Sequence, residues 1–222
     1  MGYIVVITGT DGCGKQTQTK CLMDRLAIEG IDAMAGTFPK YDSPSSAPVK
    51  MYLGGEFGDA NSLDAYQAST LYAVDRLCTY NKDMKEYYEN GGIIVLDRYV
   101  ESNMLHQAGK IRDRAEVDKY LEWLEDFEYG KLKLPKPDKV IFLDVPIEVS
   151  LKLKENRAYK AETKKDVQED DVEHLINAYN SGKYVSEKYG WTTISCVEDG
   201  QLLSIETIAE KVWNSVKEDL KN

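Results

Sequence analysis

The feature that most constrains this chain is a stretch near its start, GTDGCGKQTQ, directly after a short apolar run. The run at residues 4–7 has the length and β-branched composition of a buried strand, and the apolar periodicity of residues 15–29, stopped by Gly30, predicts a helix. A glycine-rich turn between a strand and a helix turns backbone N–H groups inward, and the helix N-terminus adds positive potential. We therefore interpret the stretch as a phosphate-binding loop and not as an ordinary glycine turn.

The loop departs from the usual Gly-x-x-x-x-Gly-Lys-[Ser/Thr] pattern at its last position. Lys15 would reach the β- and γ-phosphates of a nucleotide, but Gln16 stands where a hydroxyl normally ligates magnesium. Gln offers an amide oxygen on a longer arm or leaves the place to water, which Mg²⁺ retains readily. Thr17 is rotated about 100° further around the helix, so it cannot replace that hydroxyl, although it is placed for an α-phosphate. The predicted nucleotide contacts are Gly9, Thr10, Asp11, Gly12, Cys13, Gly14, Lys15, Gln16 and Thr17.

Strand-like and helical patterns alternate along the rest of the chain. Apolar runs at 93–96, 140–143 and 192–196, and a weaker one at 33–38, predict further strands, and two helical faces repeat apolar residues at intervals of three and four. Such alternation favours a parallel sheet covered on both sides by helices. We expect one domain over residues 1–222. The first helical face comprises Leu63, Tyr66, Thr70, Ala73, Val74 and Leu77, and the second comprises Ile205, Ile208, Ala209, Val212, Trp213 and Val216.

Composition excludes several classes of protein. A net charge of −10 argues against a general nucleic-acid binder, which would present a basic face. Four scattered cysteines and only two histidines suit neither a zinc site nor a disulfide framework, so we expect reduced thiols and a cytoplasmic protein. The first apolar run is too short for a signal sequence or a membrane span. The expected partners are therefore small molecules, with neither nucleic acid nor membrane among them.

Three polar features are candidates for a site, and the last two of them each have a plainer alternative. Asp97 and Arg98 follow a strand-like run, and ligands of open parallel sheets bind at the carboxyl ends of strands. Tyr72 and Arg76 share a helix face, either to read a base or as a core residue beside a surface cation. The segment 152–171 carries dense charge of both signs, which suits either a solvated helix face or a mobile lid over phosphates. The residues alone leave both pairs of alternatives open.

Five motifs, in order, resemble those of thymidylate kinases, which phosphorylate dTMP with ATP. They are GTDGCGKQTQ, FPKY at 38–41, LYAVDR at 71–76, DRYVESN at 97–103 and LPKPD at 134–138, with the charged segment at the expected place after them. The resemblance spans nearly the whole chain. It implies an α/β P-loop kinase fold, with a five-stranded parallel sheet flanked by helices on both faces and a short lid at about 154–170. It also implies ATP as phosphoryl donor, Mg²⁺, and a homodimer formed through helices around residues 45–88.

The resemblance also implies roles for individual residues in the acceptor pocket. Arg98 would hold the acceptor phosphate, Arg76 would read the thymine edge, and Tyr72 would stack on the base. Lys40 stands where the family usually has Arg, and as a point charge it lacks the bidentate fork. His106 stands where the family often has the Tyr linked to rejection of ribonucleotides. The acceptor-binding residues are Asp11, Phe38, Lys40, Tyr41, Tyr72, Arg76, Arg98, Asn103, His106 and Gln107.

For catalysis, the resemblance implies an arginine in the phosphate loop or in the lid. Cys13 occupies the loop position, so the expected charge-stabilising residues are Arg157 and Lys160, acting with Lys15 and Arg98. Asp97 and Asp11 are the expected carboxylates near the metal. Thr8 stands where a Glu is common, and this change, like that at Gln16, removes a polar group near the metal. The lid carboxylates Asp166 and Glu169 face substrate or metal, or simply solvent.

Three alternatives remain open at this point. A related kinase would use another acceptor, such as dUMP or a different deoxynucleotide. A non-catalytic homologue would bind ATP without turnover, as the altered positions Thr8 and Gln16 would allow. A switch or motor NTPase is disfavoured, because the chain lacks the Asn-Lys-x-Asp pattern that recognises guanine.

Overall fold

The computed structural model describes residues 1–59, 61–158 and 172–220, with side chains omitted for 153–158. The described part contains a five-stranded sheet in the order β2-β3-β1-β4-β5, in which every neighbouring pair is parallel. This confirms the predicted sheet and the P-loop kinase type of α/β fold. The strands are β1 (Tyr3–Thr8), β2 (Ala33–Thr37), β3 (Ile93–Asp97), β4 (Lys139–Asp144) and β5 (Thr192–Ser195).

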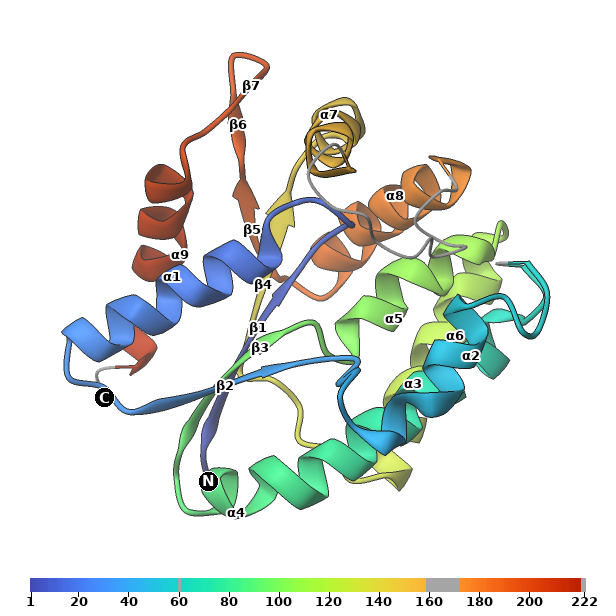
Figure 1. Ribbon diagram of the computed structural model, residues 1–222, viewed down its shortest axis with the longest axis horizontal. Coiled ribbons are helices and arrows are strands. Elements are labelled where there is room, and N and C mark those ends of the chain that lie inside the picture. The colour runs from blue at the N-terminus through green and yellow to red at the C-terminus, as the bar shows by residue number, and fades with distance from the viewer. Residues whose placement is uncertain (60, 159–171, 221–222) are drawn as a thin grey trace.

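Helices cover both faces of the sheet (Figure 1). α1 (Lys15–Ile28) and α9 (Ile205–Leu220) pack on the face to which Val5 and Ile7 of β1 point. Ile4 and Val6 point the other way, into a second cluster. Because both faces are buried, β1 is a continuous apolar run and not an alternating one. The helices of the opposite face are α3 (Ala65–Thr79), α5 (Glu101–His106), α6 (Arg114–Glu125) and α8 (Val172–Lys188).

Further described elements lie between these strands and helices along the chain (Figure 1). They are η1 (Pro44–Ser46), α2 (Ala47–Leu53), the π-turn η2 (Tyr80–Met84), α4 (Lys85–Glu89), η3 (Ala108–Lys110), the π-turn η4 (Asp126–Lys131), α7 (Ile147–Ala158), and the hairpin strands β6 (Val197–Glu198) and β7 (Gln201–Leu202). Of the helices described, none is long and apolar enough to cross a membrane.

The parallel register places the first loop beside the end of β3. Ile7 of β1 lies opposite Asp97, the last residue of β3, and its carbonyl accepts a hydrogen bond of 3.2 Å from the backbone N–H of Arg98. All carboxyl ends of a parallel sheet meet at one edge, so the loop after β1 and the residues after β3 share that edge. Two segments about 90 residues apart in sequence are thereby brought into one site.

The two predicted helical faces agree with the structure to different degrees. In α9, Ile208, Val212 and Val216 are buried as expected, whereas Ile205 at the first turn is exposed. In α3 the expected apolar face is wrong in part, because Tyr66 and Val74 are 36% and 47% exposed. The buried face of α3 instead carries Ala65, Ala68, Ser69, Ala73, Asp75, Arg76 and Thr79. The pattern of apolar residues mispredicts the buried face of this helix, because that face supplies polar side chains to an interior cavity.

Candidate active site

The loop between β1 and α1 has the geometry of a phosphate-binding loop. Gly14 precedes α1 with φ of 92°, a left-handed conformation that glycine adopts without a Cβ clash, and the helix start has no side-chain cap. Its free N–H groups and helix dipole favour an anion. Lys15 is buried, and its Nζ donates to the carbonyls of Gly9 at 3.0 Å and Thr10 at 2.8 Å. Lys15 therefore lies along the loop, in the wall of a cavity of about 170 Å³.

An ion pair between Asp11 and Arg98 closes one side of this cavity. Arg98 Nη2 donates to Asp11 Oδ1. Burial alone would raise the pKa of Asp11, but the charges of Arg98 and Lys15 outweigh it and hold that pKa far below its usual range. Arg98 itself has φ of 66°, in the left-handed region that non-glycine residues rarely adopt. This turn at the end of β3 aims the guanidinium at the loop.

Asp97 is the candidate for the magnesium side of the loop. Its Oδ1 is buried and has no hydrogen-bond partner among the described residues, and burial raises the pKa of its carboxyl. An unsatisfied carboxylate oxygen beside a phosphate cavity fits a magnesium ion held mostly by phosphate oxygens and water. Asp11 fits that role less well because its carboxylate already accepts from Arg98. Within the described part of the chain, no cluster of three ligating side chains forms a metal site independent of a nucleotide.

A second cavity, of about 630 Å³, lies next to the first. Its volume is in the usual range for a small-molecule site. All ten residues assigned to the acceptor line it: Asp11, Phe38, Lys40, Tyr41, Tyr72, Arg76, Arg98, Asn103, His106 and Gln107. The structure therefore brings together side chains from the loop after β1, the end of β2, α3, the end of β3 and α5.

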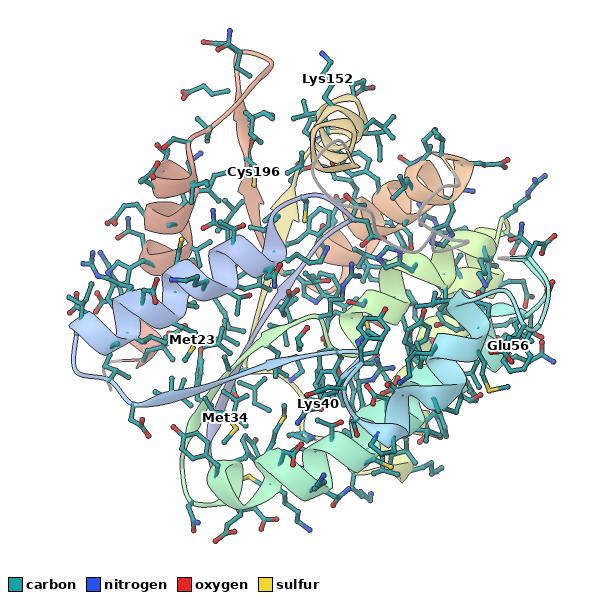
Figure 2. All side chains as sticks on the ribbon, in the orientation of Figure 1. Met23, Met34, Lys40, Glu56, Lys152 and Cys196 are labelled. Carbon is teal, nitrogen blue, oxygen red and sulfur yellow. The ribbon has the colours of Figure 1, made fainter. Side chains whose placement is uncertain are left out.

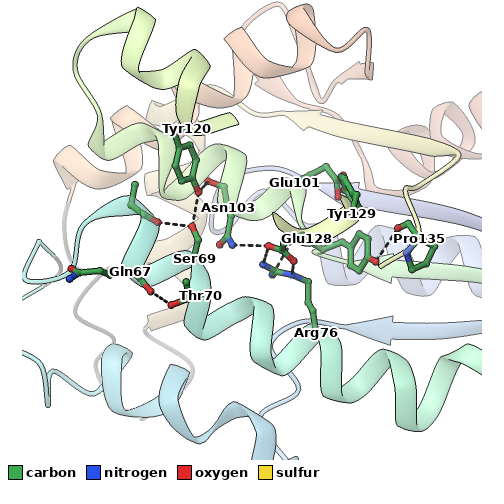
Figure 3. Close-up of polar contacts among 12 residues, drawn as sticks. Gln67, Ser69, Thr70, Arg76, Glu101, Asn103, Tyr120, Glu128, Tyr129 and Pro135 are labelled. Carbon is green, nitrogen blue, oxygen red and sulfur yellow. Dashed lines mark hydrogen bonds and ion pairs between the residues drawn. The ribbon is translucent and has the colours of Figure 1, made fainter. Parts of the chain in front are cut away.

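Arg76 is fixed in the wall of this cavity by a buried carboxylate (Figure 3). Its Nε donates to Glu128 Oε2 at 2.6 Å and its Nη2 to Oε1 at 2.5 Å, a bidentate pair whose members are 2% and 0% exposed. Burial would lower the pKa of Arg76, but the Glu128 charge raises it, so the side chain stays charged. The alternative that Arg76 is a surface cation is wrong. A buried, oriented guanidinium is suited to reading a polar edge of a ligand.

Comparison with known proteins accords with this geometry. The sequence profile of one family, described as thymidylate kinase, matches residues 7–191. The thymidylate kinase of Mycobacterium tuberculosis is 30% identical over 158 residues, which is 71% of this chain and 72% of the relative. A probable thymidylate kinase of Thermococcus gammatolerans is 30% identical over 76% of this chain and 77% of its own length. The chain belongs to the thymidylate kinase family. A thymidylate kinase of Prochlorococcus marinus, 25% identical, aligns with 96% of this chain and 93% of its own length.

Lys40 is held by two carboxylates of this chain. It is labelled in Figure 2, and it lies where the chain leaves β2 and approaches η2. Its Nζ donates to Asp83 Oδ2 at 2.6 Å, and its backbone N–H donates to Asp75 Oδ2 at 2.8 Å. The Asp83 hydrogen bond raises the pKa of Lys40. Although Lys40 lines the larger cavity, its ammonium is already engaged by a carboxylate of this chain.

Most of the segment predicted to form a lid, at about 154–170, falls outside the described residues. The described backbone places Arg157 in the last turn of α7, but its side chain is not described. Lys160, Asp166 and Glu169 lie outside the described part altogether. Their roles stay predictions.

Several residues of the site were not predicted from the sequence. Ser102 lines the larger cavity with an Oγ that has no partner among the described residues. Asp75 and Glu128 are fully buried and hold Lys40 and Arg76. Glu128 sits in the polar stretch DFEYGK, where it gives no local signal that distinguishes it from a surface glutamate. Asp144 ends β4 as Asp97 ends β3, yet it accepts from Tyr179 and Lys183, each at 2.8 Å.

Proposed function

We propose that this protein transfers the γ-phosphoryl group of ATP to dTMP, giving dTDP and ADP. The observation that carries the proposal is the junction between the two cavities. Asp11, Gln16, Asp97 and Arg98 line both of them. A donor phosphate chain on the loop and an acceptor monophosphate in the larger cavity would therefore meet at the Asp11–Arg98 pair. Alignment of two phosphates is the main requirement of phosphoryl transfer.

Different residues of the site have different proposed roles in this reaction. The loop N–H groups and Lys15 hold the β- and γ-phosphates, and Arg98 holds the acceptor phosphate whose oxygen attacks the γ-phosphorus in line. Asp11 orients Arg98. No general base is needed, since a monophosphate is already largely ionised near neutral pH. Arg157 and Lys160 are proposed to balance the charge that develops in the transition state.

Magnesium is proposed as the metal that accompanies ATP. Asp97 and Gln16 would face it, Asp97 through its unpartnered carboxylate oxygen and Gln16 from the cavity wall, directly or through water. When bound, the ion neutralises phosphate charge. Asp11 would support this region through Arg98.

Base and sugar recognition are assigned to the larger cavity. Phe38 and Tyr72 supply aromatic surface, and Arg76 supplies the oriented donors that a thymine carbonyl requires. Asn103 lines the same cavity, and its Nδ2 donates weakly to Glu128 Oε1 at 3.4 Å. His106 and Gln107 are proposed to line the sugar side, with Tyr41 at the rim, where it is 51% exposed.

The deciding experiment is an ADP-release assay with ATP, Mg²⁺ and dTMP, with dUMP, dCMP, dGMP and no acceptor run in parallel. We expect release that depends on dTMP. Release with another deoxynucleotide alone would assign a different acceptor. ATP binding without release for any acceptor would identify a non-catalytic homologue.

Restoring the usual loop residue tests the altered metal position. We expect Gln16→Thr to lower the Mg²⁺ concentration for half-maximal activity on the order of tenfold, because a hydroxyl there ligates the ion directly. The measurement is a magnesium titration of dTMP-dependent ADP release. Gln16→Leu, which offers no oxygen, serves as the control and should show no such gain. An unchanged magnesium requirement in Gln16→Thr would argue against Gln16 facing the metal.

We also propose a homodimer that forms through α2 and α3, in the cytoplasm. Apolar side chains are exposed on these two helices and on the turn between them, with Val74 at 47%, Phe57 at 39%, Met51 at 37% and Tyr66 at 36%. A second copy of the chain that covered these side chains would remove their apolar area from water. The four cysteines are all free thiols, which suits a reducing compartment.

A charge placed on this surface should separate the subunits. We expect Val74→Glu to weaken the dimer on the order of a hundredfold, because the carboxylate would be desolvated at an interface. Size-exclusion chromatography with light scattering gives the mass. Val172→Glu on α8, a site of 48% exposure, is the matched control and should stay dimeric. A dimeric Val74→Glu protein would place the interface elsewhere.

A further inference from the structure

The only two histidines of the chain meet in its interior. His106 on α5 and His174 on α8 are 68 residues apart in sequence, and each is 6% exposed. His106 Nδ1 lies 3.3 Å from His174 Nε2, and the rings are inclined by only 19° with centroids 5.5 Å apart. With the ring planes nearly parallel and the centroids 5.5 Å apart, the two rings meet edge to edge. This is the arrangement that a hydrogen bond between ring nitrogens requires.

The other nitrogen of His106 faces the guanidinium assigned to the acceptor phosphate. His106 Nε2 lies 3.3 Å from Arg98 Nη1, while Arg98 Nη2 donates to Asp11 on its other side. Among the described side chains, the Arg98 guanidinium is therefore held by one partner from the phosphate loop and one from α5. His106 in turn contacts His174 on α8. The phosphate loop, α5 and α8, which are distant from one another in sequence, therefore all contribute to the position of the Arg98 guanidinium.

The direction of each hydrogen bond follows from the chemistry of the donors. A guanidinium can only donate, so His106 Nε2 accepts and carries no hydrogen. Burial lowers the pKa of His106 to about 3, and the Arg98 charge acts in the same direction, so the ring is neutral and its hydrogen is on Nδ1. That hydrogen is donated to His174 Nε2, which must therefore be the acceptor. Both rings are then neutral, with hydrogen on Nδ1.

We propose that His174 is a positioning residue for Arg98. By accepting the Nδ1 hydrogen of His106, it fixes the tautomer in which Nε2 accepts from Arg98. The opposite tautomer would set an N–H against guanidinium donors and release Arg98 from this side. The assignment of Arg98 to the acceptor phosphate rests on the proposed function. The arrangement of the three side chains does not depend on it.

Two substitutions of His174 separate hydrogen bonding from packing. His174→Phe keeps a ring but removes the acceptor, and His174→Gln loses the ring but keeps an amide oxygen within reach of His106 Nδ1. We expect His174→Phe to raise the KM for dTMP about fivefold to tenfold, with the KM for ATP changed less than twofold. His174→Gln should stay within about twofold of the wild type for both. A normal dTMP KM in His174→Phe, or equal losses in both variants, would overturn the proposal.

Nitrogen-15 NMR reads the tautomers without substrate. Tag-free protein labelled at histidine contains only these two imidazoles. We expect each wild-type ring to show a protonated Nδ1 and an unprotonated Nε2, and the His106 signals of His174→Phe to lose this fixed tautomer. A wild-type His106 that is cationic or protonated on Nε2 would overturn the proposal. Absent dTMP turnover in the wild type would overturn the proposed function instead, and the tautomer result would still decide whether His174 orients His106.

Discussion

Replacing Lys15 with Met is expected to lower kcat for dTMP phosphorylation on the order of a thousandfold. The Lys15 side chain is 6% exposed, and its ammonium is held by two loop carbonyls at the edge of the phosphate cavity. A single cation at a transferring phosphoryl group is worth about this much or more. The measurement is steady-state ADP release at saturating ATP and dTMP.

Lys20 offers a matched control on the same helix. Its Nζ pairs with Asp24 at 2.5 Å, and its side chain is 75% exposed. Lys20→Met should leave kcat within about twofold, because exposed ion pairs contribute little. Circular dichroism should show both variants folded. A loss of less than tenfold in a folded Lys15→Met protein would contradict the role given to the loop.

The second large effect is expected at Glu128. Glu128→Ala leaves the Arg76 guanidinium buried without its partner, and breaking a buried pair from one side costs about 3–5 kcal/mol of unfolding free energy. The same change frees Arg76 to turn from the cavity, so the KM for dTMP should rise while the KM for ATP stays near that of the wild type. Urea unfolding gives the stability, and initial rates give the two KM values.

A double variant separates the two consequences. Replacing both partners, in Arg76→Met with Glu128→Met, removes the buried charges together and should restore stability to within about 1–2 kcal/mol of the wild type. It should not restore dTMP binding, because the donors that face the thymine edge are gone. Recovery of dTMP binding in the double variant would contradict the assignment of Arg76. Glu116→Ala, which breaks an exposed pair with Lys119, is the control and should change stability by less than about 1 kcal/mol.

Much of the fold is predictable because its signals are local. The apolar run of β1, the glycine turn and the periodicity of α1 lie within the first 30 residues, and each appears in the structure close to its expected bounds. The end of β3 could be placed for the same reason. The ten acceptor-pocket residues were reached through the family motifs, and they line one cavity. Their chemical roles stay predictions.

The inward face of α3 could not be predicted in this way. Periodicity assigns apolar residues to the core, yet Val74 is exposed, and Arg76 is buried beside a carboxylate 52 residues away. Nothing near Arg76 or Glu128 in the sequence marks them as partners. Their contact depends on how α3 and η4 pack over the sheet.

The sequence by itself determined the five strand segments, the helix after the first of them, the phosphate loop and the charged residues that follow β3. These depend on short-range properties: side-chain periodicity, the freedom of glycine, and the meeting of parallel strand ends at one edge. Only the tertiary structure decided which partner each charged side chain takes. Asp83 engages Lys40, Glu128 engages Arg76, and His174 contacts His106, across 43, 52 and 68 residues. Most buried polar groups are hydrogen-bonded, and the packing of distant elements decides which partner each of them takes.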